Sequence, residues 1–176
     1  MEFLNNLRLK WHEFVLRKRI KRKRVNHHSI GIQQARKIGI LFDATRDENS
    51  IFVDNYARIL RKNGKKVECL AYIDDLEEHE TLRYEHFNKK DLSWYLHPKK
   101  QTASQFMDTK FDILLCLFTN PVLPLEYISA LSSANFRVGH YSDDKLHCYD
   151  LMIDNTDGND LQKFIGEVDQ RLKIFN

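Results

Sequence analysis

Short apolar runs alternate with amphipathic segments over most of the chain. Residues 37–43 (KIGILFD) form an apolar run that is too short for a helix and typical of a strand buried on both faces. Apolar positions recur every three to four residues over 46–62, which predicts a helix, and 67–73 is a second apolar run. A strand, a helix and a second strand predict a right-handed crossover between parallel strands.

Local residue types mark both ends of this first helix. Thr45 is followed three positions later by Glu48, which matches the spacing of a capping box. We therefore expect the Thr45 side chain to cap the helix N-terminus. Gly64 suits the left-handed residue that ends a helix.

The second half of the chain repeats the alternation. The clearest strand is predicted at 111–118, and Pro124 suits the first turn of a helix that reaches Ala134. Further strands are expected at 84–88, 136–141 and 149–154, and further helices at 102–107 and 160–175. This pattern predicts the α/β class for residues 37–176, a Rossmann-like domain with a doubly wound, mostly parallel sheet of five or six strands.

Residues 1–28 precede this domain as a basic amphipathic N-terminal helix or arm, and 29–36 are expected to form a linker. At about 100° per residue, six apolar side chains fall within one arc of about 120° and are expected to dock: Phe3, Leu4, Leu7, Trp11, Phe14 and Val15. A weaker second stripe contains Leu9, Leu16 and Ile20. Beyond Arg17, cations occupy every side of the helix, so this half is expected to stay in solvent.

Residues 17–24 read RKRIKRKR, the densest charge in the chain. Residues 1–36 hold ten Lys and Arg against two acids, whereas the remainder holds 18 against 23, so the net charge of +3 hides a basic arm on an acidic body. Such asymmetry indicates a polyanionic partner. We expect the arm to contact RNA phosphates, with Trp11 docking against protein or a base, through Arg17, Lys18, Arg19, Lys21, Arg22, Lys23 and Arg24.

The leading interpretation is a non-enzymatic, cytoplasmic RNA-binding protein, ribosome-associated and anchored to rRNA phosphates by its arm. The alternative is a peripheral protein that uses the same arm on an anionic membrane surface or at the translocon, at the inner membrane. RNA is favoured because the densest charge lies beyond the apolar stripe rather than along its polar flank.

A further alternative is a small enzyme with a site at the carboxyl edge of the sheet, where α/β proteins bind ligands. The possible ligand crevice contains Asp43, Thr45, Thr119, Asn120 and His140. Polar residues are also ordinary at strand ends and helix caps. We therefore expect the first and central strands to be neighbours without any convergence of their side chains, and we assign no catalytic residue.

Specific contacts are expected for the strand-end residues instead. Asp43 is expected to bond local backbone or Arg46, and His140 to be solvated beside Asp143. No glycine-rich phosphate loop follows any predicted strand, and neither C-x-x-C nor H-x-x-x-H occurs, so no cofactor or metal is predicted.

Cysteine usage and hydropathy indicate a reducing compartment. The three cysteines are too scattered for a disulfide framework. The longest apolar run, 113–118, is far short of a membrane span, and no signal-peptide core occurs near the N-terminus.

Several segments together resemble an uncharacterised family of small proteins from Bacteroidota-type bacteria: 38–45 (IGILFDAT), 89–94 (KKDLSW), 123–131 (LPLEYISAL), 136–139 (FRVG) and 149–154 (YDLMID). The resemblance extends over nearly the whole length, including a basic N-terminal arm. It implies a bacterial cytosolic protein with a domain of unknown function, and it brings no catalytic residues.

Overall fold

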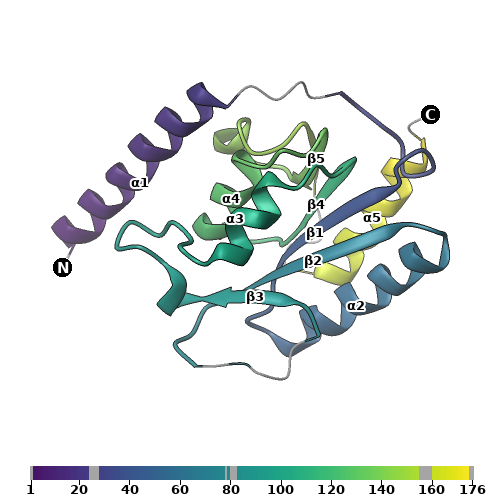
Figure 1. Cartoon of the computed structure of the whole chain (residues 1–176), viewed down its shortest axis with the longest axis horizontal. Coiled ribbons are helices and arrows are strands. Elements are labelled where there is room, and N and C mark those ends of the chain that lie inside the picture. The colour runs from purple at the N-terminus through teal and green to yellow at the C-terminus, as the bar shows by residue number, and fades with distance from the viewer. Residues whose placement is uncertain (1, 24–27, 78, 80–82, 155–159, 175–176) are drawn as a thin grey trace.

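The computed structural model describes residues 2–23, 28–77, 79, 83–154 and 160–174 (Figure 1). Within these residues, one six-stranded sheet has the order β3-β2-β1-β4-β5-β6, and every neighbouring pair is parallel. The strands are β1 (Lys37–Asp43), β2 (Lys66–Ile73), β3 (Glu85–Asn88), β4 (Ile113–Leu117), β5 (Phe136–His140) and β6 (Leu151–Ile153). This is the strand order of a Rossmann fold, so the predicted α/β class is confirmed.

Helices cover both faces of the sheet (Figure 1). They are α1 (Glu2–Arg22), α2 (Asp47–Lys62), α3 (Gln101–Asp108), α4 (Leu123–Ala130) and α5 (Leu161–Ile174), with short 3-10 turns η1 (Lys89–Asp91) and η2 (Asp143–Lys145). Helices α2 and α5 pack on one face, α3 and α4 lie on the other, and α1 lies outside α3 and α4.

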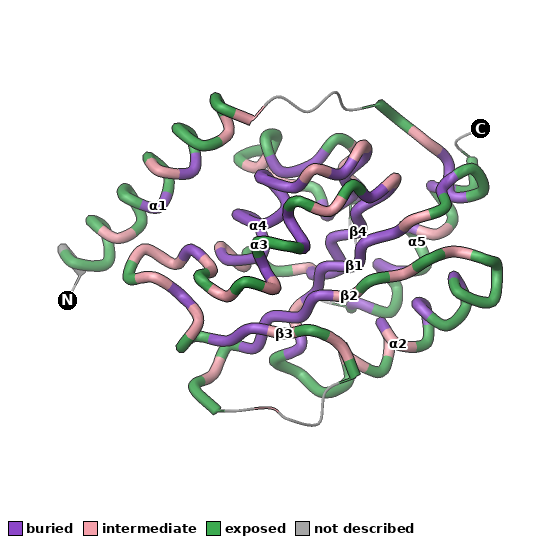
Figure 2. Tube along the Cα trace, in the orientation of Figure 1, coloured by how far each residue is buried: buried purple, intermediate pink, exposed green. Residues whose placement is uncertain are grey.

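Strand alternation divides the core into two halves. Ile38, Ile40 and Phe42 of β1 belong to the core beneath α2 and α5, whereas Leu41 and its β2 partner Leu70 belong to the core beneath α3 and α4. Because both faces are covered, the central strands are buried along their length (Figure 2). Continuous apolar runs are therefore what the sequence shows there.

The predicted cap of α2 is wrong. Arg46 is the N-cap residue and makes no side-chain capping bond, and α2 begins at Asp47. The Thr45 hydroxyl instead donates to Asp43 Oδ1 (2.5 Å) and accepts from the backbone N–H of Asp74 (2.9 Å). The Thr45 hydroxyl thus links the ends of β1 and β2 and is not available to cap α2. Gly64 follows α2 with a φ of +80°, as predicted.

The docking face of α1 also differs from the prediction. The expected stripe faces solvent, since Leu4 is 68% exposed and Phe14 is 58% exposed, and the side chain of Phe3 lies outside the described residues. His12 and Leu16, each only 4% exposed, lie against the body instead. The residues of α1 that contact the body recur every three or four positions, but most of them have polar side chains or long charged ones. Hydropathy therefore points to the wrong side of the helix.

Candidate functional site

Polar contacts hold α1 on the body. His12 Nδ1 hydrogen-bonds the Tyr95 carbonyl (3.0 Å), and the Arg19 guanidinium donates to the Tyr127 hydroxyl while lying 5.8 Å from that ring centre. Further along the helix, Lys23 Nζ donates to the Leu131 carbonyl. These contacts fix which face of α1 is left for partners.

Two histidines meet in this interface. The rings of His12 and His97 are 4.7 Å apart, and His97 lies 3.8 Å from the Tyr127 ring. Burial lowers the pKa of His12, with Glu126 acting in the opposite direction. Burial, then the charges of His12 and Arg19, lower the pKa of His97 to about 3. Both imidazoles are therefore neutral at pH 7 while α1 is docked.

The cations predicted to bind RNA are divided between the two sides of α1. Arg19 and Lys23 are used against the body, and Arg24 lies outside the described residues. Arg17 is exposed and pairs with Glu13 (2.6 Å). The remaining predicted cations are exposed on the outer side: Lys18, Lys21 and Arg22.

Exposed aromatic rings lie beside these cations. Trp11, one of the predicted RNA contacts, stacks on Trp94 with ring centres 6.2 Å apart, and Phe14 lies 5.8 Å from Trp11. Trp94 is 56% exposed. We call Trp11, Phe14 and Trp94 the aromatic platform. Its ring faces and the nearby cations have the chemistry of single-stranded nucleic-acid sites.

The sheet edge holds a separate crevice. Strands β1 and β4 are neighbours, as predicted, and the strand order reverses direction between them. A cavity of about 580 Å³ there is lined by Asp43, Thr45 and Asn120, together with Arg8 of α1. Thr119 and His140 are not among its lining residues. Three of the five predicted crevice residues are thus brought together.

The acids of the crevice have different partners. Asp43 Oδ1 accepts from the backbone N–H of Thr45 (2.9 Å), whereas Arg46 pairs with Glu48. Asp74 accepts from the Tyr72 hydroxyl (2.7 Å) and pairs with Lys89 (3.0 Å). Burial and then the bond to Asp74 raise the pKa of Tyr72 well above its ordinary value.

The expectation of a solvated His140 is wrong. His140 is buried at the end of β5 between the rings of Phe118 and Tyr149, and its Nδ1 has no hydrogen-bond partner in the described part of the chain. Burial lowers its pKa. Asp143 accepts from Tyr141 instead. The cause is the segment after η2, which folds the Tyr149 ring over β5.

A partly buried ion pair between β5 and the residue before β6 was not anticipated from the sequence. Arg137 is bidentate to Asp150, with Nε–Oδ2 and Nη2–Oδ1 distances of 3.0 and 2.8 Å, and Nη1 donates to the His147 carbonyl (3.0 Å). These bonds fasten the β5–β6 connection. Nearby Cys116 is fully buried, and burial raises the pKa of its thiol to about 12, so it cannot supply a thiolate at pH 7.

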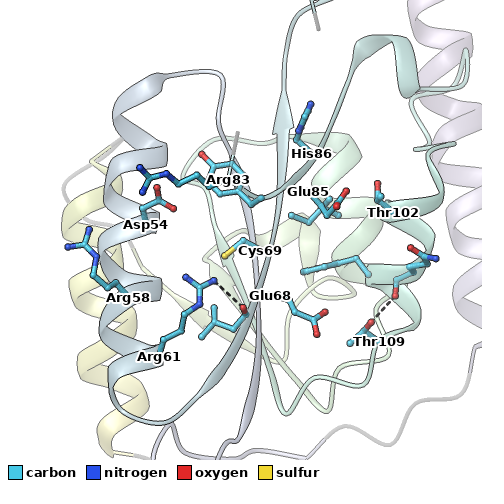
Figure 3. Close-up of a pocket in the computed structure, with 15 residues that line it drawn as sticks. Asp54, Arg58, Arg61, Glu68, Cys69, Arg83, Glu85, His86, Thr102 and Thr109 are labelled. Carbon is cyan, nitrogen blue, oxygen red and sulfur yellow. Dashed lines mark hydrogen bonds between the residues drawn. The ribbon is translucent and has the colours of Figure 1, made fainter. Parts of the chain in front are cut away.

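A second cavity of about 810 Å³ lies beside β2, between α2 and α3 (Figure 3). Strand β3 pairs only with residues 70–73 of β2, so the first half of β2 borders this groove. Arg61 Nη2 donates to the Val67 carbonyl there (3.1 Å). Burial raises the pKa of the Cys69 thiol to about 11. The groove offers backbone groups and mixed charges, and its Cys69 thiol stays protonated at pH 7.

Neither a metal centre nor a membrane span occurs in the described part of the chain. It contains no group of three or more His, Cys, Asp or Glu side chains that could hold a metal ion. None of its helices has the length and apolar character needed to cross a bilayer.

Comparison with known proteins identifies a family whose function is unknown. No curated protein matches the chain. A family model described as "Family of unknown function (DUF6913)" matches residues 8–175. The match begins within α1 at Arg8 and extends to the end of α5. Since it covers nearly the entire sequence, the chain belongs to the DUF6913 family.

Proposed function

We propose that this protein is a non-enzymatic, cytoplasmic RNA-binding protein that associates with the ribosome through the outer face of α1. The observation that carries the proposal is the joint exposure of two features: the aromatic platform, which joins α1 to the body beside the docking contacts, and a row of cations on the outer side of α1. Docking presents this surface in one orientation, so little ordering entropy is lost when RNA binds.

The charged half of the surface neutralises phosphates. Lys18, Lys21 and Arg22 are exposed and make no hydrogen bond or ion pair with the part of the body that the structure describes, so their charges are available to RNA. Each phosphate contact releases counterions, which makes affinity fall with salt concentration. The aromatic platform adds stacking on unpaired bases, worth about 1–3 kcal/mol per base.

A charge-neutralising triple variant tests this role. Lys18, Lys21 and Arg22 are changed together to Gln, and RNA binding is measured from about 50 to 200 mM salt. The log–log salt slope should fall by about 2, and affinity at about 0.1 M salt should fall about a hundredfold, since each contact contributes about 0.7 to the slope. Co-sedimentation with ribosomes should be lost in parallel.

The matched control removes three exposed cations from the body, Lys62, Lys66 and Lys110, also as Gln. It changes net charge equally but leaves α1 intact. An equal loss of affinity in both variants would refute a site on α1, and so would absence of RNA binding by the parent protein.

A second candidate is binding to an anionic membrane surface. The observation that favours it is the exposure of Leu4 and Leu7 on the same outer face as Trp11 and Phe14. Apolar residues flanked by cations are typical of helices that lie in the interface plane. The predicted docking stripe, by facing solvent, is free to enter such an interface.

Leu4 and Leu7 separate the two candidates, because aliphatic side chains do not stack on bases. Changing both to Ser should leave RNA affinity within about threefold, since the change spares charges and rings. The same change should weaken binding to anionic phosphatidylglycerol vesicles strongly, because buried apolar area contributes much of interfacial affinity. Vesicle binding that depends on these leucines, with no RNA binding by the parent, would establish the membrane candidate.

A further inference from the structure

We propose that the crevice at the carboxyl ends of β1, β2 and β4 binds a small zwitterion with an apolar body, such as an apolar amino acid or a dipeptide of apolar residues. The cavity, about 580 Å³, lies where the strand order reverses. Ligand sites of α/β folds concentrate at this position, and their volumes are of this order. The proposal is independent of RNA binding by α1.

Arg8 supplies the cationic end of the site. It extends from α1 to line the crevice, and its Nε is buried with no hydrogen-bond partner among the described residues. A buried donor without an acceptor is unfavourable unless a ligand satisfies it. The planar guanidinium matches a carboxylate, which can accept two parallel hydrogen bonds from it.

Asp43 supplies the anionic end. Its Oδ1 accepts from the Thr45 backbone and hydroxyl, whereas Oδ2 has no hydrogen bond or ion pair among the described residues. Asp74, by contrast, is occupied by Tyr72 and Lys89. The charges of Asp43 and Arg8 both act on the Tyr72 hydroxyl, in opposite directions, so both lie near it. A ligand ammonium group at Asp43 Oδ2 and a carboxylate at Arg8 would satisfy both.

The remaining lining suits an apolar body. It includes Leu92, Leu96, Pro121, Val122, Leu123 and Pro124. Leu96 has a φ of +65°, a left-handed conformation that is uncommon for residues other than glycine. Such backbone strain concentrates at ligand sites, where the surrounding contacts maintain it. Here the Leu96 N–H donates to the Ser93 carbonyl (3.0 Å), and the Ser93 N–H donates to the His97 carbonyl (2.8 Å).

Helix termini at the crevice argue against a phosphate ligand. The first turn of α2, just beyond Thr45, carries Asp47 and Glu48, which repel an anion. Helix α4 has Pro124 in its first turn, which removes one N–H donor there. Lys89 also lines the crevice, but it pairs with Asp74 (3.0 Å). The Arg8 guanidinium therefore remains for an anion, and it is enough for one carboxylate.

Occupancy should also tighten the docking of α1, because Arg8 belongs to that helix. A ligand that binds the docked arrangement better than the undocked one stabilises it by its difference in affinity. Hydrogen exchange of the α1 amides reports this directly, without any RNA present.

Titration calorimetry of the full-length protein with L-leucine and the dipeptide Leu-Leu tests the proposal. The matched analogues are 4-methylpentanoate, which lacks the amine, and 3-methylbutylamine, which lacks the carboxylate. We expect at least one zwitterion to bind and to slow α1 exchange. Each analogue should bind at least about tenfold more weakly, because one charged contact is missing. The relative affinity of the two zwitterions distinguishes a free amino acid from a peptide.

Variants then place the site. Arg8→Gln and Asp43→Asn should each weaken zwitterion binding at least about tenfold. The controls make the same changes elsewhere, at Arg17 on α1 and at the exposed Asp144 of η2, and should leave binding within about twofold. Absence of binding by both zwitterions at about 10 mM overturns the proposal. So does equal binding of the single-charge analogues, a comparison that requires no variant to fold.

Discussion

Replacing Leu16 with Ala should loosen α1 from the body, whereas the same replacement at Leu7 should not. Leu16 is 4% exposed and belongs to the core beneath α3 and α4, and Leu7 is 45% exposed. Both changes are Leu→Ala within the same helix. The change in helix propensity is therefore the same for both substitutions. The difference between their effects on α1 stability measures docking alone.

The magnitude follows from the burial of Leu16. Truncating a fully buried leucine costs about 2–5 kcal/mol, and the lower end applies where the surroundings can close over the gap. A helix on the surface of the body can shift in this way, so about 2 kcal/mol is expected for Leu16→Ala. That corresponds to roughly a thirtyfold fall in the docking equilibrium constant. Leu7→Ala should stay within about 0.5 kcal/mol.

Hydrogen exchange measures the effect helix by helix. Protection of the α1 amides should fall about thirtyfold in Leu16→Ala, while amides of β1 and β4 change much less, because opening of α1 is a local event. Tryptophan fluorescence provides a second measurement, since the Trp11–Trp94 stack spans the same interface. Equal effects of the two substitutions, or a larger effect of Leu7→Ala, would show that α1 docks by the apolar stripe after all.

Two further predictions concern buried groups. Docking of α1 should weaken as pH falls below about 6.5, the ordinary histidine pKa, because His12 and His97 have lowered pKa values when docked and therefore bind more protons when exposed. Hydrogen exchange of the α1 amides between pH 7.5 and 5 measures this. Protection that rises on acidification would contradict the prediction. Gly139→Ala should destabilise the protein by about 3 kcal/mol, since the new Cβ would lie 2.3 Å from the Tyr149 ring. Gly166→Ala, in an open position on α5, should stabilise it by up to about 1 kcal/mol in the same denaturant titration, and the reasoning fails if both variants shift in the same direction.

The sheet was predictable because its strands are buried on both faces. Residues 37–43 were assigned as a strand with the observed bounds, since an apolar run of this length has few alternatives. The Thr45 cap failed because its hydroxyl had a competing partner in Asp74, distant in sequence. The spacing of residues along the sequence indicates which local hydrogen bonds are available, and here a hydrogen bond to a distant segment replaced the local cap.

The candidate sites were less accessible to sequence reasoning. The crevice acids Asp43 and Asp74 follow apolar runs and could be located, but Arg8 comes from the arm, and no periodicity connects the arm to a strand end. His140 directly follows apolar Val138 and Gly139, yet the ring that buries it belongs to Tyr149. The residues around His140 in the sequence do not indicate that a distant segment will bury it. The docking face of α1 was missed for a related reason, since His12 and Arg19 bind through specific acceptors rather than through hydrophobicity.

The first half of β2, which β3 does not cover, has a consequence for behaviour at high concentration. An unpaired strand edge is a template on which another chain can add, and it is a common start of aggregation. Arg61 occupies the Val67 carbonyl, and the exposed charged side chains of Lys66 and Glu68 alternate along the same stretch. The Arg61 side chain of α2 thus covers this unpaired edge of the sheet. Shortening Arg61 should leave the fold intact but expose that edge, so self-association should increase with protein concentration.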